Sequence, residues 1–246
     1  MKIVNILNIN ILSVTKASFL EKIIYPRLKY QQLTHIVTAN PEVIVKTYDN
    51  EQYSQSISTA DFIIADGIGV VKGARMLGGD IPERIAGFDL MQDLLEYANR
   101  NQLSCYFFGG SNIVIQEMIN KLSNRFNNIS VVGYHNGYDD IDEGLISQEL
   151  RTKKPDLIFV GLGVPKQEDW IRIHKSKVNK GVFIGVGGSF DVLAGKVKRA
   201  PNLWIKLNLE WLYRVIKQPT RLRRLSSNFK FIFLIFRQKF QKVPKN

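Results

Sequence analysis

The 246-residue sequence contains one cysteine, Cys105, and three histidines. A single cysteine excludes a disulfide framework and favours a reduced, intracellular setting. The histidines are too far apart in the sequence to show the spacing of a zinc site; they are His35, His135 and His174. No run approaches the ~20 apolar residues of a membrane-spanning helix. The N-terminus has no small-residue cleavage site after its interrupted apolar stretch, so we predict a first strand there and not a signal peptide.

Several fingerprints of nucleotide-using and hydrolytic enzymes are also missing. The dinucleotide motif G-x-G-x-x-G fails at three glycine pairs, because Lys72, Lys166 and Phe190 stand where the third glycine is needed. The sequence contains neither a G-x-x-x-x-G-K-[ST] loop nor a G-x-S-x-G elbow. These absences disfavour an NAD-dependent oxidoreductase, a P-loop NTPase and a serine hydrolase.

Positive charge is concentrated at the C-terminal end of the chain. The net charge is +12, and residues 196–246 hold fourteen of the 34 lysines and arginines but one of the 22 acids, Glu210. Apolar residues at helical one-face spacing occur in the same segment, namely Phe229, Ile232, Phe233, Phe236 and Phe240. A basic and aromatic segment favours a membrane surface. Docking of this segment against the main domain is the alternative, and nucleic acid is a second candidate surface.

The rest of the chain alternates between apolar and helical patterns. Six β-rich apolar runs cover 35–39, 62–66, 104–108, 129–134, 156–160 and 181–186, and helical periodicity covers 88–100, 113–126 and 143–153. Continuous apolar strands that alternate with helices are typical of a parallel sheet with both faces covered. We predict a doubly wound, Rossmann-like α/β domain over 1–195 and a basic, apolar helical appendage over 196–246.

Small and polar residues follow most of the predicted strands. In doubly wound sheets, ligands bind beyond the carboxyl ends of the strands. Glycines in these loops let the backbone approach a ligand, and the following helix N-termini favour phosphate. Tight turns are the alternative explanation of any single loop, but the series predicts a nucleotide site. The glycines we assign to it are Gly109, Gly110, Gly163 and Gly187.

Polar side chains at the strand ends are candidates for the chemistry. Asp66 follows a buried run and is a candidate general base, although an aspartate there equally suits a helix cap. Thr38 and Asn40 are placed to bind sugar hydroxyls or to shape a turn before a proline. Arg84 is a candidate for holding a phosphate or carbonyl, and Gln167 lies in a dense polar cluster after a strand.

Two further groups have competing interpretations. Asp140 and Asp142 resemble a metal-binding carboxylate pair, but an acidic first helical turn is the favoured interpretation. A transferase without a metal still needs cations for a leaving diphosphate, and guanidinium groups suit this role. Tail arginines near a proline could converge on one pocket, with attraction to lipid headgroups as the alternative; those assigned to the site are Arg214, Arg221 and Arg224.

Taken together, the motifs resemble those of the WecG/TagA/CpsF family of glycosyltransferases. The resemblance runs from about residue 34 to 224 and is carried by VTANPE, ADGIGVV, RIAGFDLM, FFGG, PDLIFVGLGVPKQEDWI, GVGGSFDVLAGKVKRAP and LEWLYR. It implies transfer of N-acetylmannosamine or a related sugar, with inversion, from a UDP donor to undecaprenyl-diphosphate-linked N-acetylglucosamine. Teichoic acid or another surface polysaccharide would be the product.

The resemblance also implies roles for individual residues. Asp66 would deprotonate the acceptor hydroxyl, and no metal or other cofactor would be required. Four positions would line the sugar site, namely Thr38, Asn40, Arg84 and Gln167. The tail arginines Arg214, Arg221 and Arg224 would close over the diphosphate at the membrane. The expected location is the cytoplasmic face of the cell membrane, with peripheral attachment. The sequence does not determine the oligomeric state, and a homo-oligomer is one of the possible states.

The sequence also allows two rival functions. A glycosyltransferase of the same fold could use another donor, such as UDP-glucose or a UDP-uronic acid. A non-enzymatic protein that senses nucleotides or binds nucleic acid through its basic tail is the rival from another class. The phenylalanines of the tail and the lack of a nucleic-acid-binding motif count against that second rival.

Overall fold

The computed structural model describes residues 2–138, 142–217 and 222–241, with the side chains of 222–224 left out. Its centre is a six-stranded sheet in the order β4-β3-β8-β7-β5-β6, in which every neighbouring pair is parallel. The strands are β3 (Thr34–Ala39), β4 (Phe62–Ala65), β5 (Ser104–Gly109), β6 (Ser130–His135), β7 (Leu157–Gly161) and β8 (Val182–Gly185). All six predicted strands are therefore confirmed. No strand end differs from the prediction by more than one residue.

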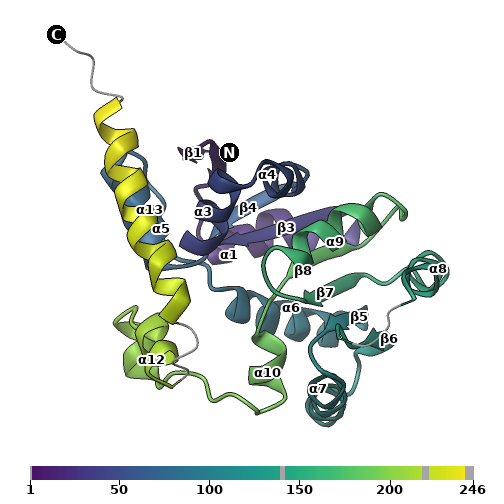
Figure 1. The fold of residues 1–246 in the computed structure, drawn as a ribbon. Coiled ribbons are helices and arrows are strands. Elements are labelled where there is room, and N and C mark those ends of the chain that lie inside the picture. The colour runs from purple at the N-terminus through teal and green to yellow at the C-terminus, as the bar shows by residue number, and fades with distance from the viewer. Residues whose placement is uncertain (1, 139–141, 218–221, 242–246) are drawn as a thin grey trace.

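Helices cover both faces of this sheet (Figure 1). One face packs against α6 (Gly87–Asn101), α7 (Asn112–Arg125) and an N-terminal group of short helices, α1 (Lys16–Phe19), the π-helix η1 (Leu20–Ile24) and α2 (Tyr25–Lys29). The other face packs against α8 (Glu143–Lys153) and α9 (Lys166–Lys175). Alternate residues of β5 divide between the two cores, with Phe107 in the first and Phe108 in the second. The doubly wound α/β prediction is confirmed.

A third core lies beside the β3–β4 edge. It joins side chains from α3 (Pro41–Asp49), α4 (Glu51–Ser58) and α5 (Ile68–Met76) to those of the N-terminal segment. That segment forms two strands rather than the one we predicted, β1 (Ile3–Ile6) and β2 (Ile9–Leu12), paired as an antiparallel hairpin outside the main sheet. Leu7 and Asn8 both have positive φ, at 48° and 68°, which is the conformation of a tight two-residue hairpin turn.

The C-terminal segment is helical, as predicted. After α10 (Ser189–Leu193) come α11 (Asn202–Lys206), α12 (Glu210–Lys217) and the long α13 (Leu222–Gln241), which lies against α3 and α5 (Figure 1, yellow). Phe231, Leu234 and Ile235 are buried in the third core, and Gly73 of α5 leaves room for the Phe231 ring. The predicted division at residue 195 stays a prediction, but α13 docks on the domain.

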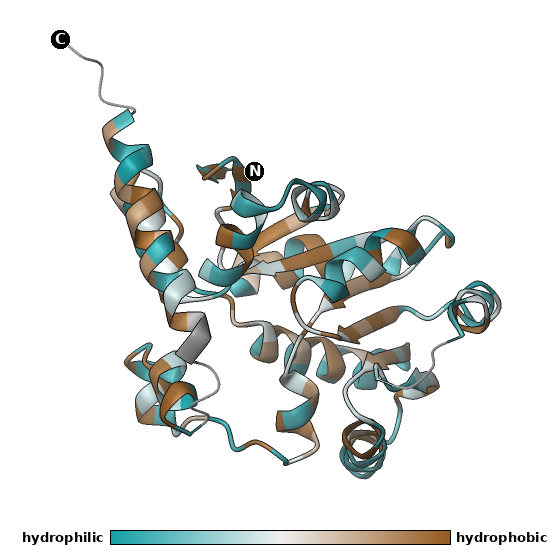
Figure 2. Ribbon diagram, in the orientation of Figure 1, coloured by the Kyte–Doolittle hydropathy of each residue, from teal (hydrophilic) through white to brown (hydrophobic). Residues whose placement is uncertain are grey.

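One side of α13 remains uncovered. Phe229, Ile232, Phe233, Phe236 and Phe240 are each at least 45% exposed. Figure 2 shows hydrophobic residues over the middle turns of α13 and hydrophilic ones at its C-terminal end. The docking alternative is therefore confirmed for one side of α13, and attachment of the open side to a membrane surface stays a prediction. Within the described residues, no helix is long and apolar enough to cross a bilayer.

Candidate active site

A cleft of about 1040 Å³ opens beyond the carboxyl ends of the strands. Its walls come from the loops after β3, β4, β5, β7 and β8, together with α12 and α13. Parallel strands all end at the same edge, so residues far apart in the sequence meet there. Of the predicted site residues, the cleft gathers Thr38, Asn40, Asp66, Arg84, Gly110, Gly163, Gln167, Gly187 and Arg214.

Asp66 lies at the junction of three elements. The register of β3 and β4 pairs Ala39 with Ala65, so Asp66 emerges beside Asn40, and its backbone N–H donates to the Ala39 carbonyl at 2.8 Å. Its carboxylate Oδ2 accepts a hydrogen bond from the Gly87 N–H, at the start of α6, at 3.3 Å. Because Gly87 has no side chain, this helix end approaches both Asp66 and Thr38 closely.

The side chain of Asp66 is not the cap of the helix that follows it. The α5 N-cap is Gly67, which has φ 117° and receives no side-chain hydrogen bond. Burial raises the pKa of the Asp66 carboxyl, an effect that the charges of Arg84 and Arg214 and the Gly87 N–H oppose. A raised pKa suits a group that must take up a proton near neutral pH. The capping alternative for α5 is wrong, and the role as a base stays a prediction.

Two arginines from distant segments meet near Asp66. Arg84 precedes α6 and Arg214 lies in α12, and both contact the carboxylate of Glu210. The Arg84 Nη2–Glu210 Oε2 distance is 3.4 Å, and the Arg214 Nη2–Glu210 Oε1 distance is 2.5 Å. The appendage thus supplies a cation to the cleft, as predicted for Arg214. Arg221 and the side chain of Arg224 lie outside the described residues.

Asn40 and Gln167 both have structural partners in addition to their place in the cleft. The Asn40 Oδ1 accepts from the Val43 N–H at 3.0 Å and caps α3, which agrees with the turn-shaping alternative. The buried Gln167 accepts from the Gly187 N–H at 3.1 Å and donates to Glu168 Oε1 at 2.5 Å. Gln167 therefore fixes the loop after β8, and a role in sugar binding stays a prediction for both residues.

The predicted glycines shape the cleft in different ways. Gly109 has φ 125°, and a Cβ there would lie 2.5 Å from the Gly161 backbone, so this glycine brings β5 and β7 together rather than lining the cleft. Gly110, Gly163 and Gly187 also have positive φ and do line it. Gly163 is the most open of them, because a Cβ there would meet nothing within 4 Å.

A buried acid behind the cleft predicts an unusual pH dependence of stability. Burial raises the pKa of Glu168 to about 7, although hydrogen bonds from Gln167 and Tyr53 oppose the shift. The carboxyl therefore ionises less readily in the folded than in the unfolded chain, and stability falls as pH rises from about 4.5 to about 7. By pH 8 the free energy of unfolding of the wild type should have fallen by roughly 3 kcal/mol on this account, and Glu168→Gln, whose side chain stays neutral, should not show this fall.

Urea unfolding at pH 5 and pH 8 measures this difference. The free energy of unfolding of wild type should drop more between the two pH values than that of Glu168→Gln. Glu117→Gln, at the exposed α7 surface, is the control and should follow wild type. Equal pH dependence in wild type and Glu168→Gln would contradict the assignment.

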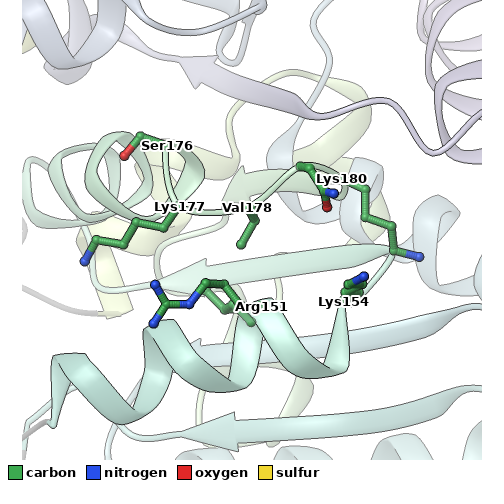
Figure 3. Close-up of a pocket in the computed structure, with 8 residues that line it drawn as sticks. Arg151, Lys154, Ser176, Lys177, Val178 and Lys180 are labelled. Carbon is green, nitrogen blue, oxygen red and sulfur yellow. The ribbon is translucent and has the colours of Figure 1, made fainter.

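A second, smaller cavity lies away from the cleft (Figure 3). Its volume is about 360 Å³, and Arg151, Lys154, Lys177 and Lys180 contribute to its lining. It sits where α8 and α9 end, and basic residues there complement the partial negative charge of helix C-termini. Lys180 also pairs with Asp156 at 2.8 Å. These cations therefore have a structural explanation, and the strand-end cleft is the better nucleotide site.

The remaining sequence candidates are structural where the structure describes them. Asp142 caps α8, because its Oδ1 accepts from the Leu145 N–H at 2.9 Å, which confirms the helix-turn interpretation. Asp140 lies outside the described residues. Another arginine of the C-terminal segment, Arg199, which precedes α11, does not line the cleft; it pairs with Asp89 at 2.7 Å and lies over the Phe88 ring. Among the residues described, no group of three metal-ligating side chains occurs.

Sequence reasoning missed three parts of the site. In the sequence Glu210 is only the single acid of the tail, and its burial, at 5% exposure, is visible only in the structure. Tyr53 donates to Glu168 at 3.1 Å from α4, a contact between residues with no shared motif. The apolar side of the cleft was also unforeseen, and it is formed by Leu207, Leu209, Trp211, Val215, Leu225, Phe229, Phe231 and Ile232.

The fold and the cleft define a doubly wound α/β protein with a candidate ligand site at the strand ends, lined in part by the C-terminal helices α12 and α13. The family follows from comparison with known proteins. Residues 4–245 match the model of the glycosyl transferase WecG/TagA/CpsF family, and the chain belongs to this family. The match includes the C-terminal segment, beyond the 34–224 range that the motifs delimited.

Curated relatives agree on one activity. The N-acetylglucosaminyldiphosphoundecaprenol N-acetyl-beta-D-mannosaminyltransferase of Staphylococcus aureus is 40% identical over 210 residues, covering 85% of this chain and 82% of the relative. Proteins of the same name from Bacillus spizizenii and Bacillus subtilis are 39% and 38% identical. Each covers 82% of this chain, and the alignments span 78% and 79% of the relatives. The family resemblance seen in the sequence is thus confirmed.

Proposed function

We propose that this glycosyltransferase moves N-acetylmannosamine from a UDP donor to undecaprenyl-diphosphate-linked N-acetylglucosamine, with inversion and without a metal, for teichoic acid or surface polysaccharide synthesis. The observation that carries the proposal is the convergence of Asp66, Arg84 and Arg214 in one cleft. A base and two guanidinium groups within electrostatic reach of one another are what this transfer needs. The names of the relatives support the choice of sugar and acceptor.

The polar part of the cleft suits the nucleotide donor. Helices α3, α5, α6 and α9 begin at the loops that line it, and helix N-termini attract phosphate. The open backbone at Gly163 and the Gly187 loop held by Gln167 let a ligand approach closely. The uracil base and the sugar of the donor can therefore lie along the glycine loops, with the phosphates near the arginines.

The reaction follows from the placement of the charges. The acceptor hydroxyl oxygen attacks the anomeric carbon of the donor sugar, and its proton passes to a carboxylate oxygen of Asp66. The bond from the anomeric carbon to the β-phosphate oxygen breaks, and UDP leaves with the electron pair. Arg84 and Arg214 stabilise the negative charge that develops on the diphosphate. This arrangement assigns no step to a metal.

The apolar part of the cleft suits the lipid of the acceptor. Trp211, Val215, Leu225 and Ile232 line the cleft, and Ile232 also belongs to the exposed side of α13. This side carries several phenylalanines near lysines and an arginine, a composition that binds anionic membrane surfaces. The enzyme would then rest on the cytoplasmic face of the membrane, with its cleft open to lipid-linked acceptor.

A donor panel tests the proposal. The protein is incubated with a short-chain lipid-diphosphate-N-acetylglucosamine and, in turn, UDP-N-acetylmannosamine, UDP-glucose and a UDP-uronic acid, with and without EDTA. We expect product with UDP-N-acetylmannosamine, detected by mass spectrometry of the lipid, at a rate that EDTA leaves unchanged. Product from another donor alone would replace the assigned sugar, and loss of product in EDTA would overturn metal independence.

A further inference from the structure

Glu210 occupies an unusual position for an acid of so basic a segment. It is the first residue of α12 and is only 5% exposed. Its two carboxylate oxygens are divided between two cations, Oε2 toward Arg84 of the catalytic domain and Oε1 toward Arg214 of its own helix. Glu210 thus bridges the appendage and the domain in the cleft beyond the carboxyl ends of the strands.

The bridge pairs one acid with two cations, and Asp66 of the same cleft is a further carboxylate within electrostatic reach of both arginines. Arg199, the third arginine nearby, has its own acid, because its Nη2 lies 2.7 Å from Asp89 and its Nε lies 3.9 Å from Glu210. Arg84 and Arg214 are left to share Glu210. Both line the cleft, and each contacts the carboxylate through one nitrogen, although a guanidinium carries five N–H donors. Donors of both groups therefore remain for a ligand.

We propose that Glu210 is a positioning residue, the resident counter-anion that holds Arg84 and Arg214 together at the diphosphate site until a substrate diphosphate binds them. The inference rests on the proposed function for the identity of that diphosphate. Without Glu210, two partly buried cations would lose the carboxylate they contact and keep only the longer-range attraction of Asp66, which is costly because they repel each other and have lost solvation. One carboxylate offsets that cost in the empty enzyme, and a diphosphate offers more charge and bidentate geometry.

A resident anion also has a consequence for affinity. Because Glu210 already offsets part of the positive charge, it weakens the attraction between the arginines and any bound diphosphate. Removal of its charge should destabilise the empty cleft and favour the occupied one. If the only role of Glu210 were to dock α12 on the domain, its substitution would have the opposite effect. Arg214 would then leave the cleft, and the diphosphate would bind more weakly.

The test compares Glu210→Gln with wild type by calorimetric titration of UDP and of inorganic pyrophosphate, and by steady-state kinetics. We expect both anions to bind about tenfold more tightly to the variant. We expect KM for the donor and kcat to fall together, because product UDP is retained. Pyrophosphate should raise the melting temperature of the variant more than that of wild type.

Two further variants make the result decisive. Glu210→Asp keeps the charge on a side chain too short to reach both arginines. It should also bind UDP and pyrophosphate more tightly than wild type, but by less than Glu210→Gln does. It gives the same comparison if the Gln variant fails to fold. Asp49→Asn removes the exposed carboxylate that pairs with Lys230 of α13 at 2.7 Å, and so removes another tie between domain and appendage. It should behave like wild type.

Weaker binding of UDP and pyrophosphate to Glu210→Gln, or affinity unchanged within twofold, would overturn the role of Glu210. The same loss in Asp49→Asn would show that Glu210 acts only through docking of the appendage, and would overturn it as well. The anion titrations need no turnover. If wild type transfers no sugar from any donor, the proposed function fails, while the titrations still decide whether Glu210 is the counter-anion.

Discussion

Asp66→Asn should lower kcat by about 10²–10⁴-fold, the usual contribution of a positioned general base, while UDP binds as tightly as to wild type. Asn is nearly the same size and can still accept from the Gly87 N–H, so the α6 N-terminus stays in place. It cannot take up the acceptor proton. Single-turnover rates with lipid acceptor, together with calorimetric titration of UDP, separate the loss of chemistry from a loss of binding.

The pH dependence of the wild-type rate belongs to the same prediction. Asp66 must be ionised to act, and burial raises its pKa above the usual value near 4. The rate should therefore fall as pH drops through that raised pKa, at a higher pH than an exposed aspartate would give. The residual rate of Asp66→Asn should lack this acidic limb.

Asp61 provides a matched control for the base assignment. It precedes the amino end of β4, whereas Asp66 follows the carboxyl end of the same strand, and it binds the His35 N–H and Lys175 instead of the cleft. Asp61→Asn should keep kcat within a few-fold of wild type at a temperature where both proteins are folded. Equal loss in the two variants, or an active Asp66→Asn enzyme, would remove Asp66 as the base.

Phe233→Glu/Phe236→Glu should abolish binding to anionic vesicles without unfolding the protein. Both rings are exposed, at 66% and 45%, and neither lines the cleft. Burial of a phenylalanine side chain contributes ~1.5–3 kcal/mol, so each substitution should weaken binding to the membrane surface by about tenfold or more. Turnover should fall with acceptor in vesicles and persist with a water-soluble, short-chain acceptor. Vesicle co-sedimentation and both assays measure this.

The control for the membrane surface is Ile113→Glu. Ile113 is 63% exposed on α7, away from α13, and its substitution introduces one of the two negative charges of the double variant and removes one exposed apolar side chain. Vesicle binding by Ile113→Glu should match wild type. Retained binding in the double variant, or equal loss in the control, would contradict membrane attachment through α13.

The main sheet and the place of the site follow from local sequence patterns. Helix α8 occupies the predicted 143–153, and the strand 104–108 gains one residue. Such runs are predictable because burial on both faces makes a strand continuously apolar. Asp66 could be placed at the cleft for a related reason, since parallel strands end at one edge and a polar residue directly after an apolar run must lie there.

Features that depend on contacts between distant segments could not be predicted in this way. The N-terminal segment pairs with itself because positive φ at Leu7 and Asn8 allows a tight turn; Asn8 tolerates this conformation, but Leu7 is not a turn residue and no glycine marks the site. The contact between Arg84 and Glu210 joins residues 126 positions apart. In the sequence, Glu210 is one acid among many bases, and only the packing of α12 reveals it as buried.

A structure of the protein with bound UDP would show where the diphosphate lies, and the roles of Arg84, Arg214 and Asp66 all depend on that position. We predict UDP in the strand-end cleft, with its β-phosphate oxygens within hydrogen-bond distance of Arg84 and Arg214 and with the Asp66 carboxylate facing the position of the anomeric carbon. UDP bound in the basic cavity between α8 and α9, or in the cleft with its diphosphate turned away from both arginines, would contradict these roles.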